Sequence, residues 1–376
     1  MDPIAHTLTG AAFAAAGLKR ATPLATAALV IGANLPDVDV VMNFAGEYAA
    51  LAHRRGWTHG VLALVVLPLV LAGSLLAYDR AVRRRRGLAP VRAGPLLALS
   101  ALAVVTHPFL DWLNNYGLRW LMPFDGRWFY GDALFIIDPW VWLGLGGVMC
   151  LAHSRSIGWI VAWAAFAALG TALMLTTPEV PTLARALWIA GVVAVAALRS
   201  SGITVQTKPR AIEHAARAAL VLLAVYSGGA ALANLPAKEI VRTTLEASGV
   251  DSIEAIMIGP KPADPFAADV VIETPHAYYV GNWHWLATPK FVPTLEPIPR
   301  GEGPIVDAAS RTLEARRYLS WSRFPFFEVE AHGDGYLVRI RDMRYRDREG
   351  RVGGLVVRLD SELRPVGPPS PSRASH

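Results

Sequence analysis

The sequence contains one cysteine, Cys150, and few charged residues, and each shortage excludes a class of protein. A single cysteine can form neither a disulfide framework nor a thiolate metal site within the chain. Charged residues make up only 18% of the 376 residues and hydrophobic residues 53%, whereas a soluble protein usually contains about a quarter charged residues. The N-terminal stretch has no basic region and is therefore not expected to be a cleaved signal peptide. The composition predicts a membrane protein rather than a soluble enzyme.

The net charge of +6 comes from basic residues that are gathered in short clusters between apolar runs. These clusters occur at residues 19–20, 80–86, 155 and 199–210. The positive-inside rule for membrane proteins accounts for them, so they give little support to a nucleic-acid partner, and none is expected. Membrane lipid is the expected partner of the apolar surface.

Apolar segments of membrane length follow one another through the first 235 residues. Six of them are long enough to cross a bilayer: residues 60–78, 94–110, 133–152, 157–177, 183–198 and 211–235. Two shorter segments, 4–18 and 22–35, are expected to form a helical hairpin among them. With all eight counted as spans, every basic cluster falls on one face, which should be cytoplasmic. We therefore predict a multi-pass protein of the cell (inner) membrane.

Residues 236–364 change in character, since the apolar runs shorten and charged residues and prolines become more frequent. Segments such as DVVIETPHAYYV, GYLVRIRDMRYR and GGLVVRLD are typical of strands, and HGDG is typical of a hairpin turn. The predicted fold is an all-α polytopic membrane domain of about six to eight transmembrane helices in residues 1–235, followed by a small β-rich extracytoplasmic domain. Residues 365–376 are rich in proline and serine and are expected to be a disordered tail.

Seven polar residues recur at the edges of the apolar segments in the first 140 residues. They are His6, Asp37, Asp39, His53, His59, His107 and Asp111. The eight-span threading places all of them on the extracytoplasmic side, opposite the basic clusters. Ionisable groups beside membrane segments are functional candidates, and imidazoles together with carboxylates are the ligands of zinc-type hydrolytic sites. The pattern predicts a metal site at the extracytoplasmic ends of the helices.

His107 and Asp111 are four residues apart in a helical segment, so both can face one metal ion. The alternative is an ordinary polar pair at a helix end. Asp37 and Asp39 flank one residue directly after a proline, in a layout common to metal-binding loops and to simple turns. His6 alone would be assigned a packing role, but its placement with the other polar residues favours a ligand.

His53 and His59 are six residues apart and share no helix face, so a turn at Gly56 is needed to bring them together. Arg54 and Arg55 lie between them, on the side where the positive-inside rule disfavours arginine. Because a guanidinium group matches phosphate oxygens, these arginines indicate an anionic substrate, and binding of lipid headgroups is an equal alternative. The candidate catalytic residues are therefore Asp39, His53, Arg54 and Arg55.

The motifs HTLTG, NLPDVD, HRRGWTHG, THPFLDWLNNYG and FIIDPW occur in this order within residues 1–145. In order and spacing they resemble the inner-membrane metal-dependent hydrolase family of the LexA-binding type. The resemblance implies a membrane-bound hydrolase. The later helices and the C-terminal region resemble the longer members of that family only loosely.

The order of these residues is also similar to that of zinc-dependent phospholipases C and single-strand-specific zinc nucleases. That resemblance implies metal ligands at His6, Asp37, His59, His107 and Asp111, with Asp111 as a bridge between ions. Those soluble enzymes also use an N-terminal amine and a later His-xxx-Glu pair, which are not evident in the sequence, so Asp39 and His53 are candidate substitutes. Zinc is the expected cofactor, and manganese and magnesium are alternatives. Two or more ions are expected, because four histidines and three aspartates exceed the needs of one tetrahedral zinc.

The sequence thus predicts a membrane-embedded metal-dependent hydrolase, phospholipase C-like in its chemistry. It would use a metal-activated water to cleave a phosphoester of an anionic lipid or isoprenoid substrate. Three other classes remain open. A role as a partner of DNA, which only the name of the resembled family suggests, would need a basic cytoplasmic domain, and none of sufficient size is visible in the sequence. A transporter would spread its polar groups through the depth of the membrane, whereas here they are predicted at one level. A structural or regulatory membrane protein would use the cluster as a closed structural metal site.

Overall fold

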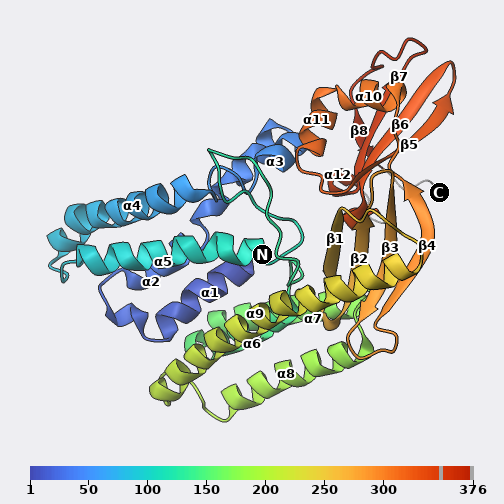
Figure 1. The fold of residues 1–376 in the computed structure, drawn as a ribbon. Helices are drawn as coiled ribbons and strands as arrows, with labels where there is room; N and C mark the ends of the chain where they lie inside the picture. Colours follow the sequence, from blue (N-terminus) through green and yellow to red (C-terminus); the bar gives the residue numbers. More distant parts are fainter. Residues whose placement is uncertain (347–349, 373–376) are drawn as a thin grey trace. The chain divides into compact units, whose positions relative to one another are not determined.

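The computed structural model describes residues 1–346 and 350–372 of the chain, which divides into two compact units (Figure 1). The first unit comprises Met1–Val38, Arg55–Asn234 and Pro260–Phe266. The second comprises Asp39–Arg54, Leu235–Gly259 and Ala267–His376. The sequence pattern assigns residues 39–54 to the membrane domain, so their membership of the second unit is a difference that the structure reveals.

The first unit is helical. Its helices are α1 (Pro3–Ala15), α2 (Ala25–Gly32), α4 (Val61–Tyr78), α5 (Ala93–Trp112), α6 (Pro139–His153), α7 (Ile157–Thr176), α8 (Thr182–Ser200) and the part of α9 (Pro209–Ala247) up to Asn234. Short 3₁₀ or π segments, including Leu35–Ala45 after α2 and Asp79–Arg86 after α4, extend some of them. The expected all-α domain is confirmed.

Six helical segments in the described part of the chain are long and apolar enough to cross a membrane. They are Ala25–Ala45, Val61–Arg86, Ala93–Trp112, Ile157–Thr176, Thr182–Ser200 and Pro209–Ala247. The chain is therefore a multi-pass membrane protein, as predicted. The expected span at 133–152 is corrected, because α6 begins only at Pro139 and has 15 residues. The Asp138 side chain accepts hydrogen bonds from the amides of Trp140 and Val141, which starts the helix there.

Small residues allow the N-terminal helices to pack closely. A Cβ atom on Gly10 of α1 would lie only 2.5 Å from the carbonyl oxygen of Leu29 in α2, so no larger residue fits at this crossing. α2 also packs against α5, which in turn packs against α4, and Ala28, Leu29 and Ala103 are fully buried among them (Figure 1). This packing brings α1, α5 and the segment after α2 together.

The second unit contains two antiparallel four-stranded sheets. The first sheet has the order β1 (Ala255–Lys261), β2 (Asp264–Glu273), β3 (Ala277–His284) and β4 (Phe291–Pro299), with the β1–β2 turn grouped into the first unit. The second sheet has the order β5 (Pro325–His332), β6 (Gly335–Asp342), β7 (Gly354–Leu359) and β8 (Ser370–Ser372). Its short helices are α3 (Glu47–His53), α10 (Pro304–Ser310), α11 (Leu313–Leu319) and α12 (Gly350–Gly353). The predicted β-rich domain and the hairpin turn at HGDG are confirmed.

An aromatic contact explains why residues 39–54 belong to the second unit. Tyr48 of α3 is buried and packs edge-to-face on Tyr318 of α11, with 6.2 Å between the ring centroids. Its hydroxyl donates a hydrogen bond to the carbonyl of Gly354. The burial of this aromatic side chain contributes favourably to the packing of α3 within the second unit.

The C-terminal segment departs from the expected disorder where it is described. The Val366 amide donates to the carbonyl of Arg358, and β8 pairs with β7 in antiparallel fashion. An exposed strand edge leaves backbone groups unpaired, and β8 satisfies those of β7. Residues 373–376 of the predicted disordered tail lie outside the described residues.

Candidate metal centre

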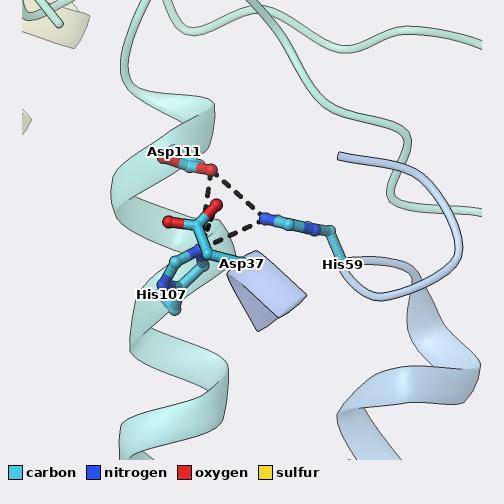
Figure 2. Close-up of side chains that lie close together, drawn as sticks. All are labelled: Asp37, His59, His107 and Asp111. Carbon is cyan, nitrogen blue, oxygen red and sulfur yellow. Dashed lines mark hydrogen bonds and ion pairs between the residues drawn. The ribbon is translucent and has the colours of Figure 1, made fainter. Parts of the chain in front are cut away.

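Four side chains from three separate segments converge in the first unit (Figure 2). Asp37 comes from the 3₁₀ segment after α2, His59 from the loop before α4, and His107 and Asp111 from α5. One ligand atom of each lies within 4.8 Å of the others. His59, His107 and Asp111 are buried, and the Asp37 side chain is 16% exposed. The structure thus contains a candidate metal-binding cluster made of four of the five predicted ligands.

The distances among His59, His107 and Asp111 are close to those around a single tetrahedral ion, and Asp37 lies somewhat farther away. His59 Nε2 lies 3.2 Å from His107 Nε2 and 3.3 Å from the nearer oxygen of Asp111. His107 Nε2 lies 3.7 Å from Asp111 Oδ2 and 3.9 Å from Asp37 Oδ1. Ligand atoms about 2.0–2.2 Å from a tetrahedral zinc are separated from one another by roughly 3.3–3.6 Å. Two imidazole nitrogens and two carboxylates are also a suitable zinc ligand set.

The two imidazoles are held in the orientation that a metal requires. His107 Nδ1 donates to the carbonyl of Ala33 over 2.6 Å, so its Nε2 presents a lone pair to the cluster. His59 Nδ1 lies 2.9 Å from the hydroxyl of Thr58, and its Nε2 also points toward the cluster (Figure 2). Hydrogen bonds of this kind fix the tautomer and ring orientation of metal-ligating histidines.

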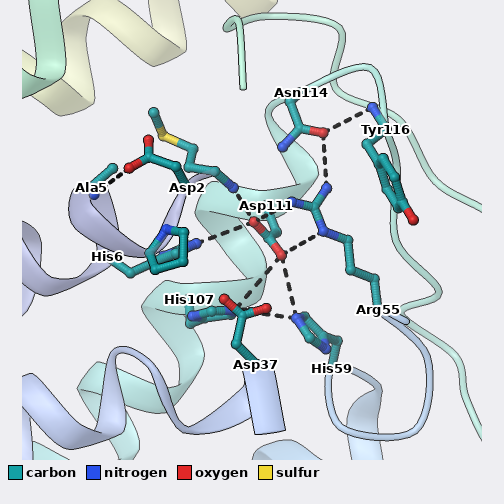
Figure 3. Close-up of polar contacts among 12 residues, drawn as sticks. Asp2, Ala5, His6, Asp37, Arg55, His59, His107, Asp111, Asn114 and Tyr116 are labelled. Atoms are coloured by element: carbon teal, nitrogen blue, oxygen red, sulfur yellow. Dashed lines mark hydrogen bonds and ion pairs between the residues drawn. The ribbon is translucent and has the colours of Figure 1, made fainter. Parts of the chain in front are cut away.

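Several side chains and the chain's N-terminal amine contact the Asp111 carboxylate (Figure 3). The Arg55 guanidinium approaches both of its oxygens, with Nε 2.8 Å from Oδ2 and Nη2 2.8 Å from Oδ1. His6 Nε2 lies 3.2 Å from Oδ1, and the α-amino group of Met1 also donates to that oxygen. Oδ1 is thus held by protein cations, while Oδ2 also faces His59. The bridging role of Asp111 between two ions stays a prediction.

The Arg55 guanidinium group contacts several other protein side chains. Besides Asp111, its Nη1 donates to the side-chain oxygen of Asn114 over 3.0 Å, and the guanidinium lies 4.6 Å from the ring centroid of Tyr116. The residue is 4% exposed and has a left-handed backbone conformation with φ of 54°. The structure therefore shows Arg55 orienting Asp111, a role that sequence reasoning did not assign to it.

His6 reaches the same site from α1. Its ring stacks on that of His107 with 3.8 Å between centroids. Its Nε2 contacts Asp111, whereas its buried Nδ1 has no hydrogen-bond partner among the described residues. His6 lies outside the group of four that share one small volume, and its role as a metal ligand stays a prediction.

The other predicted catalytic residues belong to the second unit. Arg54 Nε lies 3.5 Å from Asp39 Oδ1, and His53 Nδ1 contacts the carbonyl of Ala49 over 2.9 Å. Their catalytic roles stay predictions. Sequence reasoning missed Met1 and Asn114; Asn114 lies three residues after Asp111 at the end of α5, a spacing that could have indicated it.

Gly60 supports His59 and offers a test of this geometry. A Cβ atom at Gly60 would lie 2.3 Å from the backbone oxygen of Met122. We expect Gly60→Ala to displace the loop that carries His59 and to weaken metal affinity roughly tenfold, as loss of supporting groups around metal ligands does. Gly73→Ala in α4 is the control, because a Cβ atom there would meet nothing within 4 Å. Titration of both purified variants with zinc measures the effect, and equal affinities would contradict the assigned role of the loop.

Comparisons with known proteins agree with the membrane architecture. Residues 1–181 match the family described as YdjM inner membrane protein, and residues 304–368 match the YfhP C-terminal alpha/beta plait domain. The chain is similar to "Uncharacterized protein YfhP" of Bacillus subtilis (strain 168), with 24% identity over 323 residues that cover 85% of this chain and 77% of that protein. No solved structure matches the chain significantly.

The match of residues 1–181 to the YdjM inner membrane protein family includes all four residues of the cluster and supports the predicted resemblance to an inner-membrane family. The resemblance to zinc-dependent phospholipases C and nucleases receives no support from these matches.

Proposed function

We propose that this chain is a membrane-embedded, metal-dependent hydrolase that cleaves a phosphoester of a lipid or isoprenoid substrate. The observation that carries the proposal is the cluster of Asp37, His59, His107 and Asp111, whose ligand atoms lie within 4.8 Å of one another. A buried group of this composition inside a polytopic membrane domain is expensive to maintain without a function.

The residues of the cluster fit a zinc-type ion and would hold it. When bound, such an ion supplies Lewis-acid polarisation of a phosphoryl oxygen and activates water near neutral pH. His107 is fixed by Ala33 and His59 by Thr58, so both rings stay oriented without substrate. Arg55 fixes the plane of Asp111 through a two-point contact and limits its movement during turnover.

Access to the cluster supports a catalytic rather than a closed structural site. Asp37 is the one partly exposed member, with 16% of its side chain accessible, whereas the other three are buried. A substrate phosphate would therefore approach from the side of Asp37. Catalytic zinc sites usually have three protein ligands and one accessible position, which matches His59, His107 and Asp111 as the buried ligands and Asp37 as the partly exposed, more distant member.

A lipid-like substrate suits the surroundings of the cluster. Two of the four ligands lie on α5 and Asp37 lies on the segment Ala25–Ala45. Both segments are long and apolar enough to span a membrane. Trp57, two residues before His59, is 59% exposed, and Phe124 in the loop after α5 is 81% exposed. Exposed aromatic side chains of this kind favour the membrane–water interface. We place the site and the C-terminal domain on the extracytoplasmic side, because the basic clusters would then lie in the cytoplasm.

Phosphate release by the full-length protein in detergent or nanodiscs tests this function. The substrates are phosphatidic acid and an isoprenyl monophosphate, each of which releases phosphate when its phosphoester is hydrolysed, and the metal content is measured on the same sample. We expect turnover with zinc, and a loss of roughly 100-fold or more in Asp111→Asn, because loss of a supporting group alone costs about 10–100-fold. Asp125→Asn, in the exposed loop after α5, is the control and should keep full activity. Metal-loaded protein that hydrolyses neither substrate would count against the function.

A further inference from the structure

An apolar cavity lies in the first unit between α6, α7 and α8, and it shares no residue with the metal cluster. Its volume is about 440 Å³, within the range of roughly 300–1,000 Å³ that is usual for small-molecule sites. Its walls are mainly aromatic and aliphatic, with Trp142, Trp163, Phe166 and Trp188 contributing the largest side chains. Such walls suit a hydrocarbon chain.

One end of this cavity carries a cation. Arg199 lines the cavity together with Ser154 and Ser200. Its Nε donates to the Ser154 hydroxyl over 2.7 Å and its Nη2 to the Ser154 carbonyl over 3.0 Å. Among the described residues, no carboxylate forms an ion pair with Arg199. The positive charge at the end of the cavity is therefore not neutralised by the protein.

A further polar group in the wall lacks a partner. The indole Nε1 of Trp163 is buried and makes no hydrogen bond within the described part of the chain. Buried donors nearly always find an acceptor. An amphiphile with ester oxygens near its headgroup would supply one, whereas a purely hydrocarbon occupant would not.

We propose that this cavity binds one anionic phospholipid, with an acyl chain among the aromatic walls and the headgroup phosphate at Arg199. α7 and α8 are both long and apolar enough to span a membrane, so lipid is the medium that surrounds the cavity. A guanidinium group matches phosphate oxygens by charge and by the geometry of its donors. The apolar walls, the unneutralised cation and the unpaired indole together fit this one class of ligand.

Native mass spectrometry of the full chain tests the proposal. The protein is equilibrated with mixed micelles that contain equal amounts of phosphatidylglycerol and phosphatidylcholine, and the bound lipids are counted. We expect one tightly bound phosphatidylglycerol per chain. Arg199→Gln should lower the ratio of bound phosphatidylglycerol to phosphatidylcholine about fivefold, the effect of one basic residue at a membrane surface. Arg155→Gln, which removes an exposed arginine outside the cavity, should leave that ratio unchanged.

A second pair of variants tests the cavity independently of charge. Ala167→Phe places a ring inside the cavity, whereas Ala168→Phe adds the same ring to an exposed neighbour on α7 that does not line it. We expect Ala167→Phe to lose most of the tightly bound lipid and Ala168→Phe to keep it, with unchanged metal content in both. Equal lipid retention by the two, or an equal effect of the two arginine variants, would overturn the proposal. Lipid loss with normal phosphoester hydrolysis would leave the proposed function intact.

Discussion

The His107→Ala protein is expected to lose its metal while keeping its helices and its C-terminal domain. His107 Nε2 lies within 3.2–3.9 Å of a ligand atom of each of the other three members of the cluster. Alanine removes the central ligand and leaves three, so metal per chain should fall roughly tenfold or more. Elemental analysis of the purified protein measures the metal, and far-UV circular dichroism checks the helices.

The matched control for this variant is His153→Ala. His153 is at the end of α6, outside the cluster, and its Nδ1 contacts the carbonyl of Met149 in the way that His107 contacts Ala33. The His153→Ala variant therefore loses a similar contact to a backbone carbonyl but no metal ligand. Full metal occupancy in His107→Ala, or equal loss in both variants, would show that the cluster is not the metal site.

The cluster was predictable from the sequence to the extent that spacing and membrane topology determine it. His107 and Asp111 lie one helical turn apart, so their convergence follows from helix geometry alone. Asp37 and His59 could be added because the positive-inside threading places the ends of their segments at one level. Their mutual distances could not be predicted, since these depend on how closely α2 approaches α1 and α5, which Gly10 and other small residues decide.

The different roles of the two adjacent arginines could not be read from the sequence. Arg54 and Arg55 look equivalent in the sequence, which predicts a phosphate-binding role for either of them. In the structure Arg55 is buried against Asp111, whereas Arg54 belongs to the second unit and contacts Asp39. The left-handed backbone conformation of Arg55 directs the two side chains to different partners. Such a conformation is uncommon for a non-glycine residue and is not predictable from the sequence here.

The spans were predictable from hydropathy, but their exact ends were not. The run from residue 133 to 152 is apolar enough to suggest one span, yet Asp138 and Pro139 fix the start of α6 six residues later. Local capping therefore decided the length of this helix. Likewise, the composition of the Pro/Ser-rich tail predicts disorder, whereas the unpaired edge of β7, a feature of the tertiary structure, orders β8.

The buried ion pair of the C-terminal domain leads to the second large expected effect. The side chains of Asp342 and Arg344 are both fully buried and approach each other to 2.9 Å. Asp342 also accepts hydrogen bonds from the Ser322 hydroxyl over 2.6 Å and from the Arg323 amide over 2.7 Å. The carboxylate thereby joins the end of β6 to the loop before β5. Removal of one partner from a buried pair leaves an uncompensated charge.

We therefore expect Asp342→Ala to destabilise the C-terminal domain by about 3–5 kcal/mol. Hydrogen exchange of the full chain, followed in peptides from β5 and β6, measures the local free energy of unfolding. Glu330→Ala is the control, because its pair with Arg339 is exposed and should contribute less than about 1 kcal/mol. Similar protection of β5 and β6 from hydrogen exchange in the two variants would show that the buried pair does not stabilise this sheet.

The same pair should make the stability of the domain depend on pH. Burial by itself would raise the pKa of Asp342, but the charge of Arg344 and hydrogen bonds from Arg344 and Ser322 outweigh it and hold the pKa below its usual value. A carboxylate with a lowered pKa in the folded state stabilises the fold above the unfolded pKa, and this contribution is lost as the pH falls through the folded value. The free energy of unfolding measured by hydrogen exchange in β5 and β6 should thus decline below about pH 4 in the unmodified chain. In Asp342→Asn this part of the decline should be absent, because the amide does not titrate, and an unchanged pH profile in that variant would assign the decline to other carboxylates.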